Sequence, residues 1–133
     1  MARNADDVET FLHQLGRSFE KREATDGEAT FLITAPNTAL MALRVAPPIV
    51  AVNVTIGPCP KDEKHQLPTY RRLLELNARD LMHASYGIEN GMIVLSAALP
   101  LDNLDANELE ATLSDIDVAL VGHTKELVHM ARD

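Results

Sequence analysis

The hydrophobic and polar positions of residues 67–100 divide this stretch into a helix followed by a two-stranded hairpin. Apolar residues recur at helical spacing from Leu67 to Leu81, and at 100° per residue they form a single stripe. The stripe comprises Leu67, Tyr70, Leu73, Leu74, Asn77 and Leu81. Asn77 is the polar exception within it. A buried amide without partners costs about 1 to 3 kcal/mol, so we expect Asn77 to bond the backbone of a neighbouring strand or turn, not a ligand.

The period changes after Met82, where a hairpin is expected. Residues 83–89 can form a strand, Asn90-Gly91 is the dipeptide that a two-residue type I′ turn favours, and residues 92–99 return as the second strand. Pro100 ends the pairing because proline has no N–H to donate. The returning strand is apolar on both faces, which is typical of a strand that is central or covered on both sides.

The first half of the chain predicts one helix and three strands. Apolar residues at helical spacing place a first helix at residues 7–22, and Asp6 with Glu9 supplies an acidic start for it. The third of these strands, at residues 49–56, has the clearest pattern, because Val and Ile alternate with small and polar residues along it. The three strands are expected at residues 30–35, 40–45 and 49–56.

The C-terminal segment predicts a third helix. Asp105 and Glu108 have the spacing of a capping box, and Leu104 and Leu109 have the spacing of a hydrophobic staple. One apolar face then follows at helical spacing, with His123 close to it as a hydrogen-bonded core residue. The face consists of Leu109, Leu113, Ile116, Leu120, Leu127 and Met130.

The order of these elements is α-β-β-β-α-β-β-α, which indicates the α+β class. Sequential strands and a hairpin favour an antiparallel five-stranded sheet, and the three amphipathic helices must place their apolar stripes on it or on a partner. A chain of 133 residues makes a single domain, residues 1–133, large enough to bury roughly two thirds of its unfolded surface.

Several apolar residues fall outside the expected core stripes, and they predict an interaction surface. The four that we single out are Leu76, Met92, Val94 and Val118. Such a surface on a monomer promotes aggregation unless it is covered, and a two-fold pairing covers it with the same patch of a second chain. We therefore expect a homodimer whose surface also binds a partner protein. The alternative is that the helix phases differ and these residues belong to the core.

Composition and charge exclude several classes of partner. Twenty acidic residues against twelve basic ones give a net charge of −8, which repels a phosphate backbone, and three Phe and two Tyr offer few stacking platforms. We therefore expect no nucleic acid partner. No window approaches the roughly twenty apolar residues of a membrane helix, so no membrane partner is expected either. A single cysteine, Cys59, cannot form an internal disulfide, which agrees with a cytoplasmic location.

No catalytic, metal or cofactor site can be assigned from the sequence. The five histidines include no pair at i, i+4, and Cys59 lies between two prolines without a Cys-x-x-Cys partner, a basic neighbour or a helix start to activate it. Phosphate-binding and dinucleotide-binding glycine motifs are absent. The acidic residues near Asp105 fit a helix start better than a calcium loop. We therefore expect a protein that is not an enzyme and that holds no cofactor or metal.

The C-terminal half resembles a known family. Residues 73–77 (LLELN), the hairpin residues 87–95 (GIENGMIVL) and the Leu99-Pro100-Leu101 ending, followed by an amphipathic helix, are similar to the type III secretion chaperone-like fold and to the related YbjN-like bacterial proteins. The similarity extends over residues 67–130. It implies a small acidic cytoplasmic protein, commonly dimeric, that holds a segment of another protein and has no catalytic residues.

Two classes of function follow from these observations. The first is a non-enzymatic binding module that takes up a partner segment by strand addition or groove packing. The second is a small-molecule sensor or enzyme with a pocket that the sequence does not reveal. The first predicts an apolar surface patch, whereas the second predicts a deep cleft with convergent polar residues.

Overall fold

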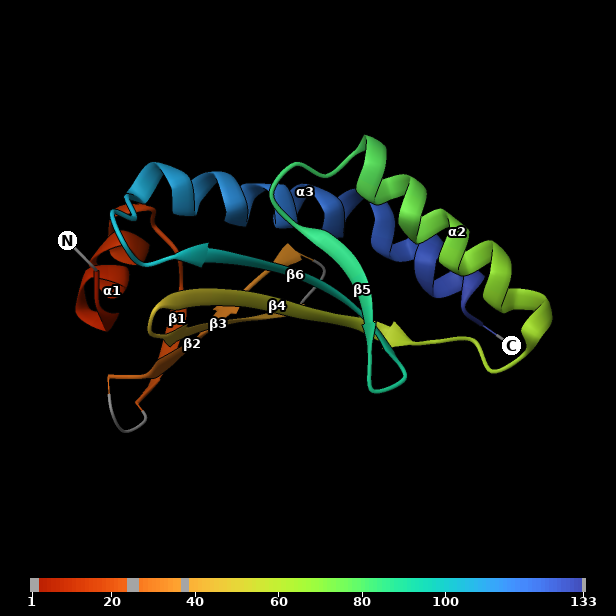
Figure 1. The fold of residues 1–133 in the computed structure, drawn as a ribbon, viewed down its shortest axis with the longest axis horizontal. Coiled ribbons are helices and arrows are strands. Elements are labelled where there is room, and N and C mark those ends of the chain that lie inside the picture. The colour runs from red at the N-terminus through yellow and green to blue at the C-terminus, as the bar shows by residue number, and fades with distance from the viewer. Residues whose placement is uncertain (1–2, 24–26, 37–38, 133) are drawn as a thin grey trace.

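The computed structural model describes residues 3–23, 27–36 and 39–132. Three helices and six strands make up this part of the chain (Figure 1). In chain order they are α1 (Ala5–Gln14), β1 (Phe19–Glu23), β2 (Ala29–Thr34), β3 (Leu40–Ala46), β4 (Ile49–Pro58), α2 (Glu63–Arg79), β5 (Ser85–Glu89), β6 (Met92–Pro100) and α3 (Ala106–Met130).

All six strands form one antiparallel sheet in the order β1-β2-β3-β4-β6-β5. The α+β class is therefore confirmed, but the five-stranded sheet is wrong because β1 lies in the segment that the sequence predicts as the end of a first helix. That helix ends at Gln14, with Leu15 as its C-cap, and Gly16 has a φ of +71° that a helix cannot continue through. Phe19 then faces inward from a strand and packs edge to face on Phe31 of β2.

The start of α1 also differs from the prediction. Its N-cap is Asn4, whose side chain accepts a hydrogen bond from the Asp7 N–H, while the Asp7 carboxylate accepts one from the Asn4 N–H. This is a complete capping box two residues before the expected pair of Asp6 and Glu9. Glu9 instead accepts a hydrogen bond from Lys21 of β1 at 2.8 Å, which lowers the pKa of its carboxyl and joins α1 to the sheet edge.

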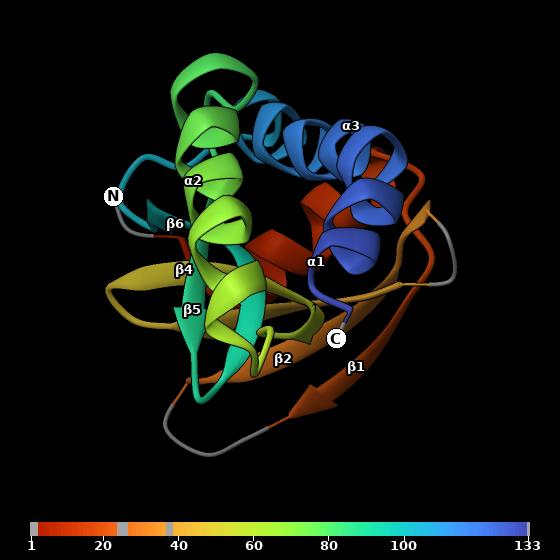
Figure 2. The same cartoon turned by 90° about the vertical axis from the view of Figure 1, so that its right-hand side faces the viewer.

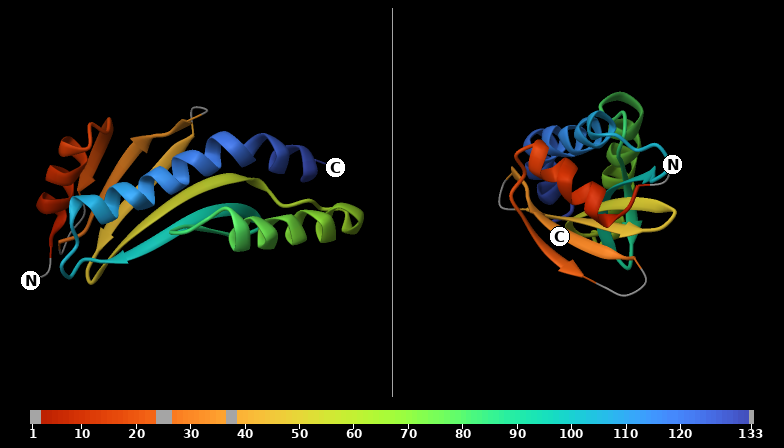
Figure 3. Two further views of the ribbon diagram at one scale, coloured as in Figure 1. Left: turned by 90° about the horizontal axis from the view of Figure 1, so that it is seen from above. Right: turned by 90° about the vertical axis from the view of Figure 1, so that its left-hand side faces the viewer.

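The three helices all lie on the same face of the sheet, as Figure 2 shows, and the core lies between the two layers. Alternate residues of each strand point into this core, so that Phe31, Leu43 and Val52 are buried while their neighbours along the strand are not. Seen from above, α2 and α3 run side by side along the sheet and α1 sits near the other end (Figure 3). Within the part of the chain that the structure describes, no helix lies on the opposite face of the sheet.

The helix α2 begins earlier than predicted and presents a different face to the core. Asp62 is its N-cap, so Pro68 lies inside the helix and not in its first turn. Leu76, expected off the core stripe, is 1% exposed, whereas Leu74, expected within it, is 69% exposed. The helix sits between β5 and α3, and that position turns the face with Leu73 and Leu76 inward.

The hairpin and the final helix agree closely with the prediction from sequence. Asn90 and Gly91 both have positive φ, 52° and 76°, as a type I′ turn requires. At the start of α3, the Asp105 carboxylate accepts a hydrogen bond from the Glu108 N–H at 2.8 Å, and Leu104 and Leu109 on either side of this cap are buried. Among the described residues, no helix combines the length and the hydropathy needed to cross a bilayer.

Candidate protein-binding surface

Asn77 joins α2 to the edge strand β5. Its amide donates a hydrogen bond to the Tyr86 carbonyl at 3.1 Å, and its Oδ1 accepts one from the Tyr86 N–H at 2.7 Å. Tyr86 belongs to the outermost strand of the sheet, so Asn77 satisfies backbone groups on the side where no further strand lies. The same two bonds that position α2 therefore occupy this part of the β5 edge.

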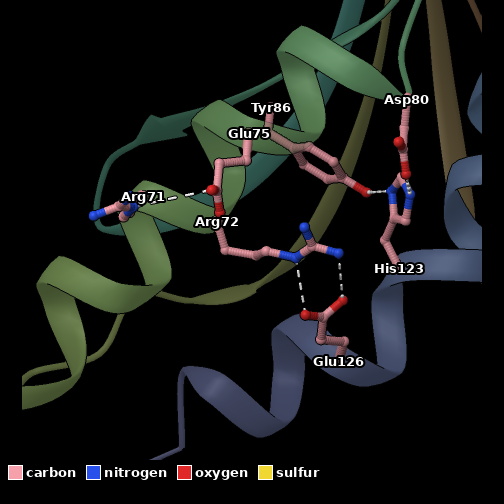
Figure 4. A network of polar contacts seen from close by, with 7 residues as sticks. All are labelled: Arg71, Arg72, Glu75, Asp80, Tyr86, His123 and Glu126. Carbon is pink, nitrogen blue, oxygen red and sulfur yellow. Dashed lines mark hydrogen bonds and ion pairs between the residues drawn. The ribbon is translucent and has the colours of Figure 1, made fainter.

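A chain of polar side chains connects Tyr86, His123 and Asp80 (Figure 4). The Tyr86 hydroxyl lies 2.9 Å from Nδ1 of His123, and Nε2 of the same ring lies 3.0 Å from the Asp80 carboxylate. Because a carboxylate can only accept, Nε2 donates to Asp80, and in the neutral imidazole Nδ1 then accepts a hydrogen bond from the Tyr86 hydroxyl. Burial, and then the negative charges of Asp80, Asp115 and Glu126, raise the pKa of the Tyr86 phenol above its ordinary value.

Tyr86 and His123 of this chain of contacts are buried between β5, α2 and α3, whereas Asp80, at the end of α2, is exposed. Tyr86 is 6% exposed and His123 9% exposed, and neither lines the apolar hollow at the end of α3 or the hollows of the helix-free sheet face. Both ring nitrogens of His123 are engaged in hydrogen bonds in this arrangement. The contacts therefore fix α3 against the end of α2 and β5, and a bidentate ion pair between Arg72 and Glu126 adds to the same interface.

The segment between α2 and β5 is held by one carboxylate. Oδ2 of Asp115, on α3, accepts hydrogen bonds from three successive backbone N–H groups, those of Met82, His83 and Ala84, at 3.2, 2.8 and 3.0 Å. This arrangement leaves the Met82 side chain 87% exposed at the end of α2. An apolar side chain is therefore presented to solvent by a well-bonded backbone.

Apolar residues continue from Met82 along the outward side of α2. We call this set the α2 stripe; it consists of Leu67, Leu74, Ala78 and Met82. Ile88 of β5, also half exposed, lies at the edge strand beside α2. Sequence reasoning assigned Leu67 and Leu74 to the core and so missed this surface. The sequence shows the apolar residues of this stripe, but it does not show which side of the helix packs inward.

The four predicted interaction residues are separated by the structure. Val118 is exposed on α3 and Met92 is partly buried at the hairpin end of β6. Val94 is 7% exposed on the helix-free face, between its cross-strand partners Thr55 and Gly87. Leu76 belongs to the core. Met92 and Val94, two residues apart, share the helix-free face of β6, but Leu76 lies in the core and Val118 lies on the exposed side of α3, so the four do not form one surface.

No described helix covers the second face of the sheet. We call it the open sheet face, and its side chains are the alternate residues that point away from the core. Along the strands these include Leu32, Leu40, Ala42, Arg44, Ala51, Asn53, Thr55, Val94, Ser96, Ala98 and Ser85. Most of them are small or apolar, and Arg44 is paired with Glu28 at 3.2 Å. Exposed charged side chains lie at the two edges of this face, Glu20 and Arg22 on β1 and Glu89 on β5.

No group of side chains in the described residues suits a metal ion. Within residues 3–23, 27–36 and 39–132, no three His, Cys, Asp or Glu side chains come together at the distances of a metal site. Cys59 is a free, partly buried thiol, and its nearest titratable partner is the hydroxyl of Tyr70, whose pKa is raised by burial and by that contact.

Comparison with solved structures shows what this fold is similar to. An uncharacterized protein from Methanothermobacter thermautotrophicus superposes with a TM-score of 0.70 at 8% identity, covering 96% of this chain and 98% of that one. A chain of the heterodimeric complex ExoU–SpcU from the type III secretion system of Pseudomonas aeruginosa gives 0.61 at 16% identity, covering 94% and 98%. YbjN from E. coli gives 0.58 at 14% identity, covering 92% and 94%. Likenesses at these identities establish the fold alone.

The sequence itself supplies the family. No curated protein matches the chain. The family model CesT_Tir_1, however, matches residues 1–133. The resemblance to type III secretion chaperones that the C-terminal half suggested is thus confirmed over the whole length, and the chain belongs to the CesT_Tir_1 family of type III secretion chaperones.

Proposed function

We propose that this protein is a non-enzymatic, chaperone-like module that holds an extended segment of a partner protein on the open sheet face. The observation that carries the proposal is that six strands have all their helices on one side, leaving a second face of small and apolar side chains. The family and the heterodimeric ExoU–SpcU complex among its structural neighbours support a protein partner.

The edges of the sheet favour one route of entry. At β5, Asn77 already bonds the outward N–H and C=O of Tyr86, which limits strand addition there. At the opposite edge, β1 has a strand on one side only. A partner segment can therefore pair with β1 and continue across the open sheet face, with main-chain bonds for affinity and side-chain contacts for specificity.

A small-molecule function has less support. The most enclosed apolar hollow, about 240 Å³, lies at the end of α3, and its walls contain a single charged side chain, Arg132. That volume is below the usual range for ligand pockets, roughly 300 to 1,000 Å³, and convergent polar groups are missing from its lining. The buried contacts of Tyr86 and His123 do not reach it. A binding module without catalysis accounts for these features better.

Homodimerisation is part of the same proposal, with the α2 stripe as the interface. Leu74, at 69% exposed, lies midway along the stripe, and a two-fold axis near it would bring the same residues of two chains together. An apolar surface of this extent is otherwise a site of aggregation. The partner segment and the second chain would then use separate surfaces, since the α2 stripe and the open sheet face belong to different layers. The lone Cys59 agrees with a cytoplasmic location for such a dimer.

Light scattering on the purified protein tests the dimer. The wild type should have twice the chain mass of 14.6 kDa at micromolar concentration, and Leu74→Glu should return it to one chain mass with an unchanged circular dichroism spectrum. Leu40→Glu changes another exposed leucine, 58% exposed on the open sheet face; it serves as the matched control and should remain dimeric. A monomeric wild type, or dissociation by both variants, would contradict the assignment of the α2 stripe.

Site-specific photo-crosslinking in the native cell tests the partner-binding face. A photoreactive residue in place of Ala42, in the middle of the open sheet face, should give an adduct with one protein, and mass spectrometry should place it in a single segment of that protein. The same residue in place of Glu110, exposed on α3, is the control and should give none. Absence of an adduct at Ala42, or equal adducts at both positions, would overturn the proposed function.

A further inference from the structure

Two hollows lie in one line across the open sheet face. The register places Leu32, Ala42, Asn53, Ser96 and Ser85 opposite one another on β2, β3, β4, β6 and β5. One hollow lies around Leu32 at the β1 side of this row, and the other lies around Asn53 and Ser96 at the β5 side. Ala42, with its single methyl group, lies between them. The row therefore forms a shallow path across the strands with a recess at each end.

The recess at the β1 side is lined by two leucines together with polar and charged residues. Its volume is about 360 Å³, and Leu32 and Leu40 are the aliphatic side chains in its lining. Leu40 is exposed over more than half of its surface, so its side chain is available for contact with an incoming side chain. The two charged residues at this rim, Glu20 and Arg22, lie 3.6 Å apart and compensate each other. This recess suits an aliphatic side chain.

The recess at the β5 side carries one carboxylate and one unpaired acceptor. Its volume is about 490 Å³, it is open to solvent, and its lining includes the small residues Ala51, Ala98 and Ser96 together with His83. Oδ1 of Asn53 is buried there without a hydrogen-bond partner, and Glu89 supplies a carboxylate. A buried acceptor without a partner is destabilising unless a donor reaches it. The arrangement is therefore matched to a side chain that carries several donors and a positive charge, which describes Lys or Arg.

The distance between the recesses sets the spacing of the occupant. Three strand steps separate Leu32 on β2 from Ser96 on β6, and at about 4.8 Å a step this is about 14 Å. An extended chain rises about 3.4 Å per residue, so residues i and i+4 lie about 14 Å apart and point to the same side. An aliphatic residue at i would then fill the β1-side recess while residue i+4 fills the other.

We infer that the partner segment is an extended, basic one with an aliphatic residue followed four positions later by Lys or Arg, which the Asn53 oxygen and the Glu89 carboxylate bind. This inference rests on the proposed function and specifies its partner. The net charge of −8 attracts a positively charged segment from a distance. The two arginines beside the path are each paired with a carboxylate, Arg22 with Glu20 at 3.6 Å and Arg44 with Glu28 at 3.2 Å.

Fluorescence anisotropy with short synthetic peptides on the full-length protein tests the inference. The probe is a labelled nine-residue peptide with leucine at its third position, lysine at its seventh and threonine elsewhere. It should bind at least tenfold more tightly than a peptide with glutamate at the seventh position. A peptide with lysine at the sixth position, which points to the other side of an extended chain, should lose the same advantage.

Variants locate the preference on the protein. Glu89→Lys should reverse the choice between the lysine and glutamate peptides, whereas Glu110→Lys, the same charge change on α3, should leave it unchanged. Leu40→Glu should weaken all peptides that carry leucine, and circular dichroism should show that the variant is folded. Equal binding of the lysine and glutamate peptides, or insensitivity to Glu89→Lys, would overturn the inference.

The outcome separates the inference from the proposed function. If peptides bind and Leu40→Glu weakens them, but no basic residue is preferred, the binding face stands and the inferred chemistry fails. If no peptide of the series binds while the adduct at Ala42 forms in cells, the inference again fails and the function stands. If neither peptide binding nor an adduct is found, both are overturned.

Discussion

The two faces of the sheet are built from the same strands and have opposite properties. On the inner face, Val52 and its neighbours are buried beneath three helices, and the polar groups that enter this layer, such as those of Asn77 and His123, have partners. On the open sheet face, Ala51 and other small residues leave hollows, and Asn53 has an acceptor that is unpaired. The contacts that stabilise the fold are therefore concentrated on the inner face. Side chains of the open sheet face can differ to suit a partner segment without loss of stability.

Substitutions on one strand should separate the two faces most strongly. Val52→Asp places a carboxylate in the core at a cost of several kcal/mol, about half or more of the stability of a typical domain, so this variant should be largely unfolded by circular dichroism. Ala51→Asp, one residue earlier on the open sheet face, should stay within about 1 kcal/mol of the wild type in urea. A folded Val52→Asp protein would show that the two faces are not distinguished by burial.

The hydrogen bonds of Asn77 are the next largest contribution to the inner face. Asn77→Leu is apolar and of similar size, yet it leaves the Tyr86 N–H and C=O without partners, and about 1 to 3 kcal/mol of the free energy of unfolding should be lost. Arg79→Leu, on the exposed side of the same helix, is the control and should have little effect. Equal urea midpoints for wild type and Asn77→Leu would mean that these two bonds contribute nothing net.

Asp115 should contribute less, because the backbone it holds is partly solvated. Asp115→Ala removes the acceptor from the N–H groups of Met82, His83 and Ala84, and water can replace it at the first two, so we expect a loss of about 1 to 2 kcal/mol. Amide hydrogen exchange should accelerate at these three positions and not in α1. Unchanged protection there would show that the carboxylate does not order this segment.

Substitution of Tyr86 should have the smallest effect on stability at neutral pH. It should also change how stability depends on pH in alkaline solution. The pKa of its phenol is raised in the folded state, so the contribution of the neutral group is fully present below the ordinary value of 10 and is lost as the pH rises beyond it. Tyr86→Phe loses the bond to His123, about 1 kcal/mol at pH 7, but its stability should decline less steeply above pH 10. Parallel urea midpoints for both proteins from pH 9 to 11 would contradict the role of burial.

The α2 stripe explains why part of the fold escaped prediction from sequence. Leucines occur on two sides of α2, so the helical periodicity of the sequence allows either Leu74 or Leu76 to face inward. The decision comes from neighbours distant in sequence: the Arg72–Glu126 ion pair and the hydrogen bond from the Thr69 hydroxyl to the Met130 carbonyl attach α2 to α3 in one rotation. No local pattern contains that information, because both contacts depend on where α3 lies.

The sequence by itself determined the elements whose signals are local. Asn90-Gly91 specifies its turn because both residues adopt positive φ angles, and Asp105 caps α3 with its own side chain. In β4, the alternation of large apolar residues with small or polar ones shows which residues face the core. Tertiary structure decided the rest. Residues 19–23 fit a helix until pairing with β2 makes them a sixth strand, and which face of the sheet stays open depends on where three helices pack. Burial is a property of the assembled layers, so the candidate binding surface became visible only when those layers were in place.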